Sequence, residues 1–334
     1  MKGIAGECDM RQLMTHDGLA LDLLGTPTQA CTLVFVNALG ISSALAEPLA
    51  AAMERVGVSL LTWDRRGLPG AHDLRFREYG LDDQLDDLAR LMERVPPGPV
   101  ILAGWCTGIH TVLAYARQWP QRVQALMLFN SPNFFDSRLS GVAGDAIGKV
   151  SRILIEDESK LEFLYRAIFA HNTEQTGARI TGLDDAWIRE LVEAPFKSGP
   201  QALLRYMYLI RSAAQPKVDR PWCAAIRVPT LVVGGRQDTM VSYGDSASLA
   251  DILPFAQLRI LDDWGHYSLF SDTQASVSEV ILPFLWTLDA FDGFIREARP
   301  PIDTCSAQGA AGAVAGALAA GGADCFDSDD RCDR

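Results

Sequence analysis

The sequence predicts an α/β protein with a doubly wound, mostly parallel sheet and a helical cap inserted between two of its strands. Continuously apolar runs of strand length alternate with stretches of helical apolar spacing, which is typical of parallel βαβ units. The alternation stops once, over residues 131–228, where helical patterns occur without a good strand. The chain has 334 residues, of which 48% are hydrophobic and 22% charged, so it can bury a large core.

Six apolar runs are expected to form the strands of this sheet. Each is rich in Val, Leu or Ile and lacks polar alternation, as a strand buried on both faces does. The runs are residues 31–37, 58–63, 100–103, 125–129, 230–234 and 257–261.

Helical spacing separates most of these runs. Residues 43–56 show it first, and residues 81–95 carry an apolar stripe that stops at a Pro/Gly cluster. A third helix is expected over 109–118. A last helix is expected over 277–298, with an interruption at Pro283.

The block between the fourth and fifth strands is expected to fold as a helical cap over the sheet. Its apolar and aromatic content indicates packing rather than a flexible insertion. Its candidate helices are residues 143–155, 159–171, 184–194 and 199–213. We therefore assign residues 1–135 and 229–300 to the α/β core and residues 136–228 to the cap. Residues 301–334 are Ala/Gly-rich and then acidic, and they are expected to form a low-complexity, disordered tail.

The charge balance excludes some partners. Lys and Arg together number 30, Asp and Glu number 42, and the net charge is −12 with a pI of about 4.9. This balance argues against a protein that binds nucleic acid by neutralising phosphates, and against adhesion to an anionic membrane.

The cysteine pattern and the lack of a long apolar segment bear on the cellular compartment of the protein. No apolar signal segment or membrane-spanning stretch is evident in the sequence. The seven cysteines are an odd number, and they lack the spacing of a zinc site or a disulfide framework. We therefore expect a cytoplasmic protein without a bound metal.

The segment 104–108, Gly-Trp-Cys-Thr-Gly, is the most informative motif. It lies directly between an expected strand and an expected helix, which is the context of a nucleophile elbow with Cys106 at the apex of the turn. The glycines are needed because the tight turn leaves no room for a Cβ. The alternative is that Cys106 is a small buried hydrophobe, the common state of a free cysteine.

A cysteine nucleophile needs a base. His266 and Asp238 each follow an expected strand, and the loops at these strand ends face the active site in such sheets. We expect His266 to be the base and Asp238 to orient it. Asp residues after strands are often turn formers, and other candidates exist for the acid. Asp262 and Asp263 lie too near His266 in the chain, and Asp136 is a weaker alternative.

The order Cys106, Asp238, His266 matches the nucleophile–acid–histidine order of the α/β-hydrolase superfamily. The chain resembles this superfamily over about residues 15–135 and 225–298, with Cys in place of the usual Ser. The resemblance implies the α/β-hydrolase fold, with the inserted cap outside the shared part.

The resemblance also implies an oxyanion hole made by two backbone N–H groups. One belongs to Thr107, which follows the nucleophile. The other is expected from Leu39 in the loop 37–40, Asn-Ala-Leu-Gly. This loop resembles the His-Ala-Leu loop of the homoserine acetyltransferase branch, with Asn37 in place of His. The segment 64–67, Asp-Arg-Arg-Gly, is similar to a further loop motif of the family.

A cysteine in this position forms a thioester acyl-enzyme. Exchange with another thiol is then nearly balanced in energy, provided that water is excluded. The chain resembles stand-alone Cys-dependent aminoacyl- and acyltransferases of nonribosomal peptide biosynthesis. That resemblance implies transfer of an acyl group, above all an aminoacyl group, between phosphopantetheine thiols through Cys106. It implies acyl or peptidyl carrier proteins as donor and acceptor partners, and no cofactor beyond the phosphopantetheine arms of those partners.

The same residues suit other reactions. Water as acceptor would make the protein a thioesterase, an internal carbanion a Dieckmann-type cyclase, and a small ester or lactone substrate a hydrolase. A receptor on the same fold and a redox sensor are further classes. The intact set of three residues argues against the receptor, and the lack of a nearby resolving Cys argues against the sensor. The aromatic residues that could either line the pocket or belong to the core are Trp105, Trp264, Tyr267 and Phe135.

Overall fold

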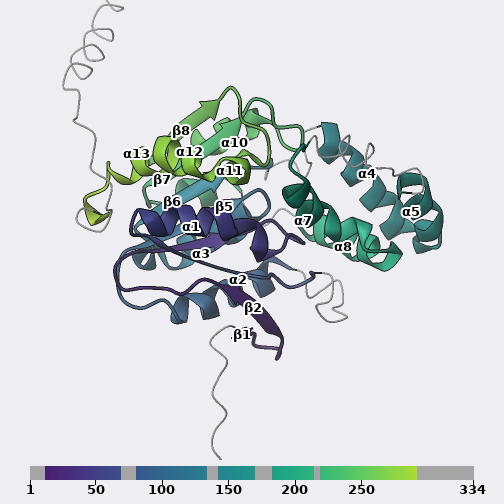
Figure 1. Cartoon of the computed structure of the whole chain (residues 1–334), viewed down its shortest axis with the longest axis horizontal. Helices are drawn as coiled ribbons and strands as arrows, with labels where there is room; N and C mark the ends of the chain where they lie inside the picture. Colours follow the sequence, from purple (N-terminus) through teal and green to yellow (C-terminus); the bar gives the residue numbers. More distant parts are fainter. Residues whose placement is uncertain (1–11, 69–79, 134–141, 170–182, 214–218, 292–334) are drawn as a thin grey trace, which may run out of the picture. The chain divides into compact units, whose positions relative to one another are not determined.

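The computed structural model describes residues 12–68, 80–133, 142–169, 183–213 and 219–291 (Figure 1). These residues contain an eight-stranded sheet in the order β1-β2-β4-β3-β5-β6-β7-β8. All six expected strands belong to it, and the predicted fold class is confirmed. The strands are β1 (Gln12–Met14), β2 (Ala20–Leu24), β3 (Thr32–Val36), β4 (Ser59–Trp63), β5 (Val100–Trp105), β6 (Ala125–Phe129), β7 (Thr230–Gly235) and β8 (Ala256–Leu261).

Strands β3 to β8 pair in parallel, whereas β1 and β2 continue the sheet beyond β4 in antiparallel pairing. These two strands were not predicted from the sequence. β1 is the edge strand and β2 lies next to it. Both are short and have exposed positions, so they lack the continuous apolar signal of a buried parallel strand. The parallel register sets Val36 opposite Gly104 and Trp105 opposite Phe129. The carboxyl ends of β3, β5 and β6 therefore finish next to one another.

Helices cover both faces of the sheet, with a separate apolar core under each. Alternate residues of β3 enter opposite cores: Leu33 and Phe35 pack on one side, Val34 and Val36 on the other. The first side is covered by α1 and the last helices of the described chain, and the second by α2, α3 and α10. The bounds of these four are α1 (Glu47–Arg55), α2 (Leu81–Glu93), α3 (Gly108–Gln118) and α10 (Tyr243–Ala250).

The expected last helix is divided into short pieces. Pro283 lies in the first turn of one of them, where its missing N–H is not needed, in agreement with the expected interruption. A π-helical segment precedes that piece. The pieces are α11 (Ser268–Ser271), α12 (Thr273–Ala275), η5 (Ser276–Ile281), α13 (Leu282–Leu285) and η6 (Asp289–Phe291). The rest of the expected helix lies outside the described residues.

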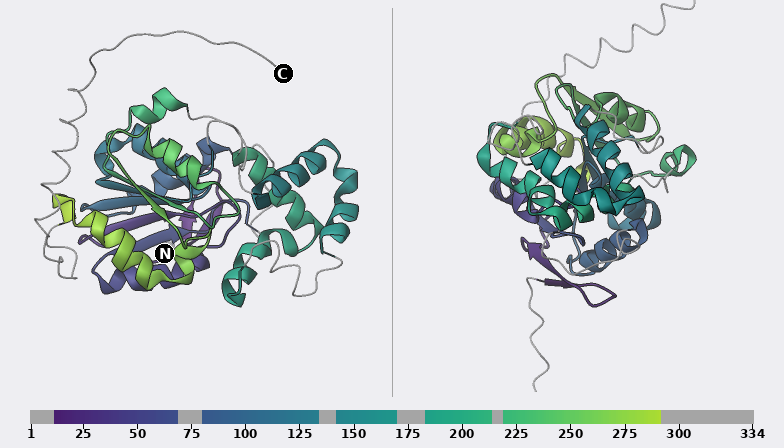
Figure 2. Two further views of the ribbon diagram at one scale, coloured as in Figure 1. Left: turned by 90° about the horizontal axis from the view of Figure 1, so that it is seen from above. Right: turned by 90° about the vertical axis from the view of Figure 1, so that its right-hand side faces the viewer.

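Between β6 and β7 the described chain is helical, as expected. The elements there are α4 (Val142–Glu156), η4 (Glu158–Lys160), α5 (Leu161–Phe169), α7 (Ala186–Lys197), α8 (Pro200–Ala213) and α9 (Arg220–Ala224). Helices α4, α5, α7 and α8 lie together beside the sheet (Figure 2). Residues of α4, α5 and α8 share a small apolar core that also includes Leu39 from the loop after β3. Helix α9 instead packs through Cys223 into the core under α2 and α3.

The domain boundaries stay a prediction, both for the α/β core (1–135 and 229–300) and for the cap (136–228). The expected tail, 301–334, lies outside the described residues. No helix in the described part of the chain is long and apolar enough to cross a bilayer.

A buried ion pair attaches α2 to the loop after β4. Arg66 Nε and Nη2 each donate to one oxygen of Asp87 at 2.7 Å, and both side chains are fully buried. Asp17, before β2, adds a contact to Arg66 at 3.2 Å. Burial raises the pKa of the Asp87 carboxyl, although the hydrogen bonds and charge of Arg66 oppose this. Loss of either partner would remove the main compensation of the other buried charge.

We expect Asp87→Ala to lower the free energy of unfolding by about 3–5 kcal/mol, because Arg66 would lose its main partner. Asp86→Ala is the matched control, since the Asp86 side chain is 59% exposed. It should change the free energy of unfolding by less than about 0.5 kcal/mol. Urea unfolding followed by circular dichroism measures both. Equal losses in the two variants would contradict the role given to Asp87.

Candidate active site

Cys106 lies in the turn between β5 and α3 with a φ of 50°, a conformation that is uncommon for a residue with a side chain. The flanking glycines make the turn possible. A Cβ on Gly104 would come within 3.0 Å of the Ile109 backbone, and one on Gly108 within 2.1 Å of the Val36 carbonyl oxygen. The turn therefore has the form of the predicted elbow, and it places the Cys106 side chain, 7% exposed, at the end of β5.

His266 and Asp238 meet at the same end of the sheet. They lie in the loops after β8 and β7, and His266 Nδ1 is 2.7 Å from Asp238 Oδ2. Both side chains are almost completely buried. Asp238 Oδ1 accepts the backbone N–H groups of Met240 at 2.8 Å and Val241 at 2.9 Å. One carboxylate oxygen thus holds its own loop, and the other holds the imidazole.

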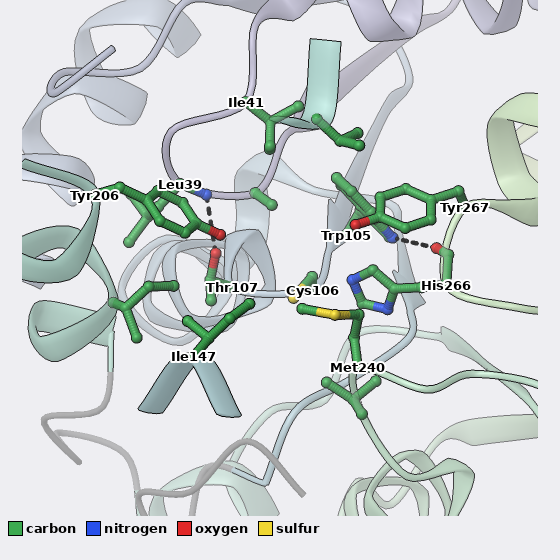
Figure 3. Close-up of a pocket in the computed structure, with 14 residues that line it drawn as sticks. Leu39, Ile41, Trp105, Cys106, Thr107, Ile147, Tyr206, Met240, His266 and Tyr267 are labelled. Carbon is green, nitrogen blue, oxygen red and sulfur yellow. Dashed lines mark hydrogen bonds between the residues drawn. The ribbon is translucent and has the colours of Figure 1, made fainter. Parts of the chain in front are cut away.

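The pKa values of this pair are set by burial and by mutual contact. Burial would raise the pKa of Asp238, but the charge and hydrogen bond of His266 and two backbone N–H groups lower it. Burial would lower the pKa of His266, but the charges and hydrogen bonds of Asp238 and Cys106 raise it to about 10. Cys106 lies beside the His266 ring (Figure 3). The ring is therefore placed to accept the proton of the Cys106 thiol.

Asn130 is a part of the site that was not predicted from the sequence. It directly follows β6 with a φ of 54°, and its Nδ2 donates to Asp238 Oδ2 at 2.6 Å. That oxygen also contacts His266, so Asn130 and His266 share it. Asn adopts left-handed backbone more readily than most residues. An Asn immediately after a buried strand was the one available signal in the sequence.

The other acidic candidates are not part of this arrangement. Asp262 pairs with Arg236 at 2.7 Å, and its side chain is 81% exposed. Asp263 is exposed as well. Asp136 lies outside the described residues. Among the described candidates, Asp238 is the one hydrogen-bonded to His266.

The loop after β3 brings the two expected oxyanion residues together, but not as expected. Asn37 shapes this loop: its Oδ1 accepts the Ala38 N–H at 2.9 Å, and its Nδ2 donates to the Ser42 carbonyl at 2.9 Å. The Leu39 N–H donates to Thr107 Oγ1 at 2.9 Å (Figure 3). The N–H predicted to bind an oxyanion directly is therefore already engaged by a hydroxyl.

The fully buried Arg65 supports the same loop. Its Nη1 donates to the Asn37 carbonyl at 2.7 Å, its Nη2 to Thr111 Oγ1 at 2.8 Å and its Nε to Gln84 Oε1 at 3.1 Å. Burial lowers the pKa of Arg65 to about 9, although the charge of Asp87 opposes this. One guanidinium thus ties the loop after β3 to α2 and α3.

Cys106 opens into a pocket of about 590 Å³, part of which is continuous with solvent (Figure 3). Its polar lining comes from Cys106, Thr107, Tyr206, His266 and Tyr267. Among the described residues that line it, none is Asp, Glu, Lys or Arg. Most of the remaining wall is aliphatic and includes Ile41, Ile147, Val192, Ile210, Met240 and Val241. Among the described residues, the space beside Cys106 is therefore lined mainly by apolar side chains, and His266 is its one basic side chain.

The aromatic residues expected at the pocket divide into two groups. Trp105 and Tyr267 line it, and Trp105 Nε1 donates to the His266 carbonyl at 3.0 Å. Trp264 packs against the sheet core instead. Phe135 lies outside the described residues.

Cys106 differs from the other described cysteines. Cys31 and Cys223 are completely buried, and burial raises the pKa of each thiol to about 12. Neither lines the pocket. In the described part of the chain, no group of three or more His, Cys, Asp and Glu side chains is placed to hold a metal ion.

Comparison with known proteins identifies the fold. The family model described as alpha/beta hydrolase fold matches residues 32–273. A protein of Variovorax paradoxus (strain S110), provisionally assigned as the carbamate hydrolase RutD, is 27% identical over 273 residues, which are 79% of this chain and 95% of that protein. A pimeloyl-[acyl-carrier protein] methyl ester esterase of Nitrosomonas europaea is 24% identical over 238 residues, 65% of this chain and 87% of its own.

A solved structure shows the same fold. The enol-lactonase from Burkholderia xenovorans LB400 matches with a TM-score of 0.61 at 19% identity, over 82% of this chain and 99% of that one. These relatives are named as hydrolases, an esterase and a lactonase. They do not support the specific resemblance to acyltransferases of nonribosomal peptide biosynthesis.

We expect Asn130→Gly to slow alkylation of Cys106 by iodoacetamide about 10-fold at neutral pH, because Asp238 loses a hydrogen bond to a charged group and holds His266 less firmly. Glycine keeps the left-handed backbone, so the substitution removes the amide without adding strain. The rate is measured by mass spectrometry of the Cys106 peptide. A rate equal to that of the wild type would contradict the role given to Asn130.

The pair of Asp238 and His266 makes stability depend on pH. Folding raises the pKa of His266 from 6.5 to about 10, so its contribution is complete below pH 6.5 and is lost as the pH rises toward 10. Folding lowers the pKa of Asp238, so its contribution is lost in strong acid. The stability difference between wild type and His266→Gln should be larger at about pH 6 than at about pH 9.5, by on the order of 1 kcal/mol. Urea titrations at the two pH values measure it, and equal differences would refute this linkage.

Proposed function

Because the chain belongs to the alpha/beta hydrolase fold family, we propose that it is an acyl hydrolase in which Cys106 is the nucleophile, His266 the general base and Asp238 the group that orients the base. The observation that carries this proposal is the sharp turn that presents Cys106 beside a buried His266–Asp238 pair 2.7 Å apart. This arrangement suits attack on the carbonyl carbon of an ester or thioester.

In the first half of the reaction, His266 accepts the thiol proton of Cys106, and Sγ attacks the acyl carbon. The C–S bond forms while the carbonyl π pair moves onto oxygen. Collapse of this intermediate expels the alcohol or thiol, which leaves with the proton from His266. Asp238 keeps the ring in one orientation and stabilises its positive charge. The product is a thioester on Cys106.

In the second half, water takes the place of the leaving group. The charge on Cys106 is one of the causes that raise the pKa of His266. That charge is absent in the acyl-enzyme, so the ring, which lost its proton to the leaving group, stays neutral more readily and serves as a base. His266 takes a proton from water, the oxygen attacks the thioester carbon, and the Cys106 thiolate leaves with the electron pair of the C–S bond. Free acid departs, and His266 returns its proton to the Cys106 thiolate, which restores the resting enzyme.

The pocket favours an uncharged and mainly apolar acyl group. A buried ammonium group would find no carboxylate among the described lining residues. The lining therefore gives no support to an aminoacyl substrate. The phenols of Tyr206 and Tyr267 supply polar atoms for a hydrogen-bonding group on the acyl chain. Hydrolysis of a small ester or a lactone falls within this proposal.

Acyl transfer from thiol to thiol is the second candidate, and the observation that favours it is the cysteine itself. A thioester acyl-enzyme exchanges with another thiol at little cost in free energy, whereas an ester on Ser would be more stable than either thioester. Donor and acceptor would then be phosphopantetheine thiols of acyl or peptidyl carrier proteins. One relative is named as an esterase for a pimeloyl-[acyl-carrier protein] methyl ester, which supports carrier-bound acyl chains as a substrate class for the present site.

Intact-mass analysis with S-butyryl-N-acetylcysteamine tests the proposal. We expect a butyryl adduct on the wild type and on the control Cys223→Ala, but not on Cys106→Ala. Cys106→Ala should lower kcat/KM by at least about 1,000-fold. A glycyl thioester, with its ammonium group, should react at least about 10-fold more slowly than the butyryl thioester.

The fate of the adduct separates the two candidates. Decay to butyrate in buffer indicates the hydrolase, whereas an adduct that persists until a second thiol is added indicates the transferase. Turnover by Cys106→Ala at the wild-type rate would contradict both.

A further inference from the structure

The Thr107 hydroxyl engages the backbone N–H of Leu39, which was expected to be the second oxyanion donor. Its Oγ1 accepts the Leu39 backbone N–H at 2.9 Å, and both residues line the pocket beside Cys106 (Figure 3). Both are nearly buried, at 6% and 5% exposed. A substrate oxygen could reach the Leu39 N–H only by displacing the Thr107 hydroxyl.

The loop around Leu39 is held from several sides. Asn37 Oδ1 accepts the N–H of the next residue at 2.9 Å, and Arg65 Nη1 donates to the Asn37 carbonyl at 2.7 Å. Gly40, with a φ of 76°, lies so close to Tyr206 of α8 that a Cβ would be 2.9 Å from the ring. The Leu39 N–H is therefore fixed in direction, and it fixes the position of the Thr107 oxygen in turn.

A hydroxyl in this position retains a hydrogen to donate. It has one O–H donor and two lone pairs, and the contact with Leu39 uses one lone pair. Accepting a hydrogen bond also polarises the hydroxyl and strengthens it as a donor. The Thr107 N–H lies at the amino end of α3, where N–H groups have no acceptor within the helix. The residue after the nucleophile thus carries two donors.

We propose that the Thr107 hydroxyl is a catalytic residue that donates the second hydrogen bond to the oxyanion, with the Leu39 N–H acting through it. This inference rests on the proposed function, since an oxyanion forms only if Cys106 attacks an acyl carbonyl. As the Sγ–C bond forms, the carbonyl π pair moves onto oxygen. That oxygen accepts hydrogen bonds from the Thr107 N–H and O–H without proton transfer. The pair returns to the carbonyl when the leaving group departs.

Two variants, Thr107→Ala and Thr107→Ser, distinguish donation by the Thr107 hydroxyl from direct donation by the Leu39 N–H. Ser keeps the hydroxyl and should stay within about 3-fold of the wild type on S-butyryl-N-acetylcysteamine. Ala should lower kcat about 100-fold with little change in KM, because the hydrogen bond forms with the transition state. Ala also uncovers the Leu39 N–H. If Leu39 donated directly, Thr107→Ala would be at least as active as the wild type, and that result would overturn the proposal.

Alkylation of Cys106 by iodoacetamide is the control, because it displaces iodide and forms no oxyanion. We expect equal alkylation rates in the wild type and both Thr107 variants. If Thr107→Ala lowers the alkylation rate of Cys106 as much as it lowers turnover, Thr107 has a structural role, and the proposal that its hydroxyl donates to the oxyanion is overturned. Failure of the proposed function gives a different result, in which Cys106→Ala turns over the thioester as fast as the wild type.

Discussion

The close approach of α3 to β3 is the contact on which the site depends. Gly108 lies against the Val36 carbonyl, where a Cβ would be only 2.1 Å away, so no larger residue fits. This contact is made together with the left-handed turn at Cys106, which directs the Cys106 side chain into the pocket. It also sets the amino end of α3 beside the loop after β3, so that the Thr107 hydroxyl reaches the Leu39 N–H. One backbone contact thus positions both Cys106 and the groups next to it.

The pKa values of His266 and Asp238 are set by their burial together with their contact with each other. Burial alone would lower the pKa of His266 and raise that of Asp238, and their mutual contact reverses both directions. Electrostatic interactions of this kind are stronger in an apolar pocket than in water. Asn130 and two backbone N–H groups hold the carboxylate in place. Cys31 and Cys223 show the contrasting case, in which burial without a base raises the pKa of the thiol.

The features that were predicted correctly are those set by residues close together in the sequence. Apolar runs predicted the six buried strands, and glycine spacing at a strand end predicted the turn at Cys106. Strands β1 and β2 escaped prediction because they are short, partly exposed strands without a continuous apolar run. Asn130, Arg65 and Tyr206 escaped it because their contacts join segments far apart in sequence. The hydrogen bond of the Leu39 N–H escaped it for the same reason, since the hydroxyl that accepts it lies 68 residues away.

Selective alkylation tests most directly whether Cys106 is a nucleophile or a packing residue. The folded protein is treated with iodoacetamide at neutral pH, and each cysteine is followed by peptide mapping. Cys106 should react at least about 100-fold faster than Cys31 and Cys223, because it lines the pocket beside His266 whereas the other two are completely buried and burial raises the pKa of their thiols. Asp238→Asn should slow Cys106 and leave the other two unchanged. If Cys106 reacts as slowly as Cys31 and Cys223 in the folded wild type, it is a buried packing residue and the assignment of the site is wrong.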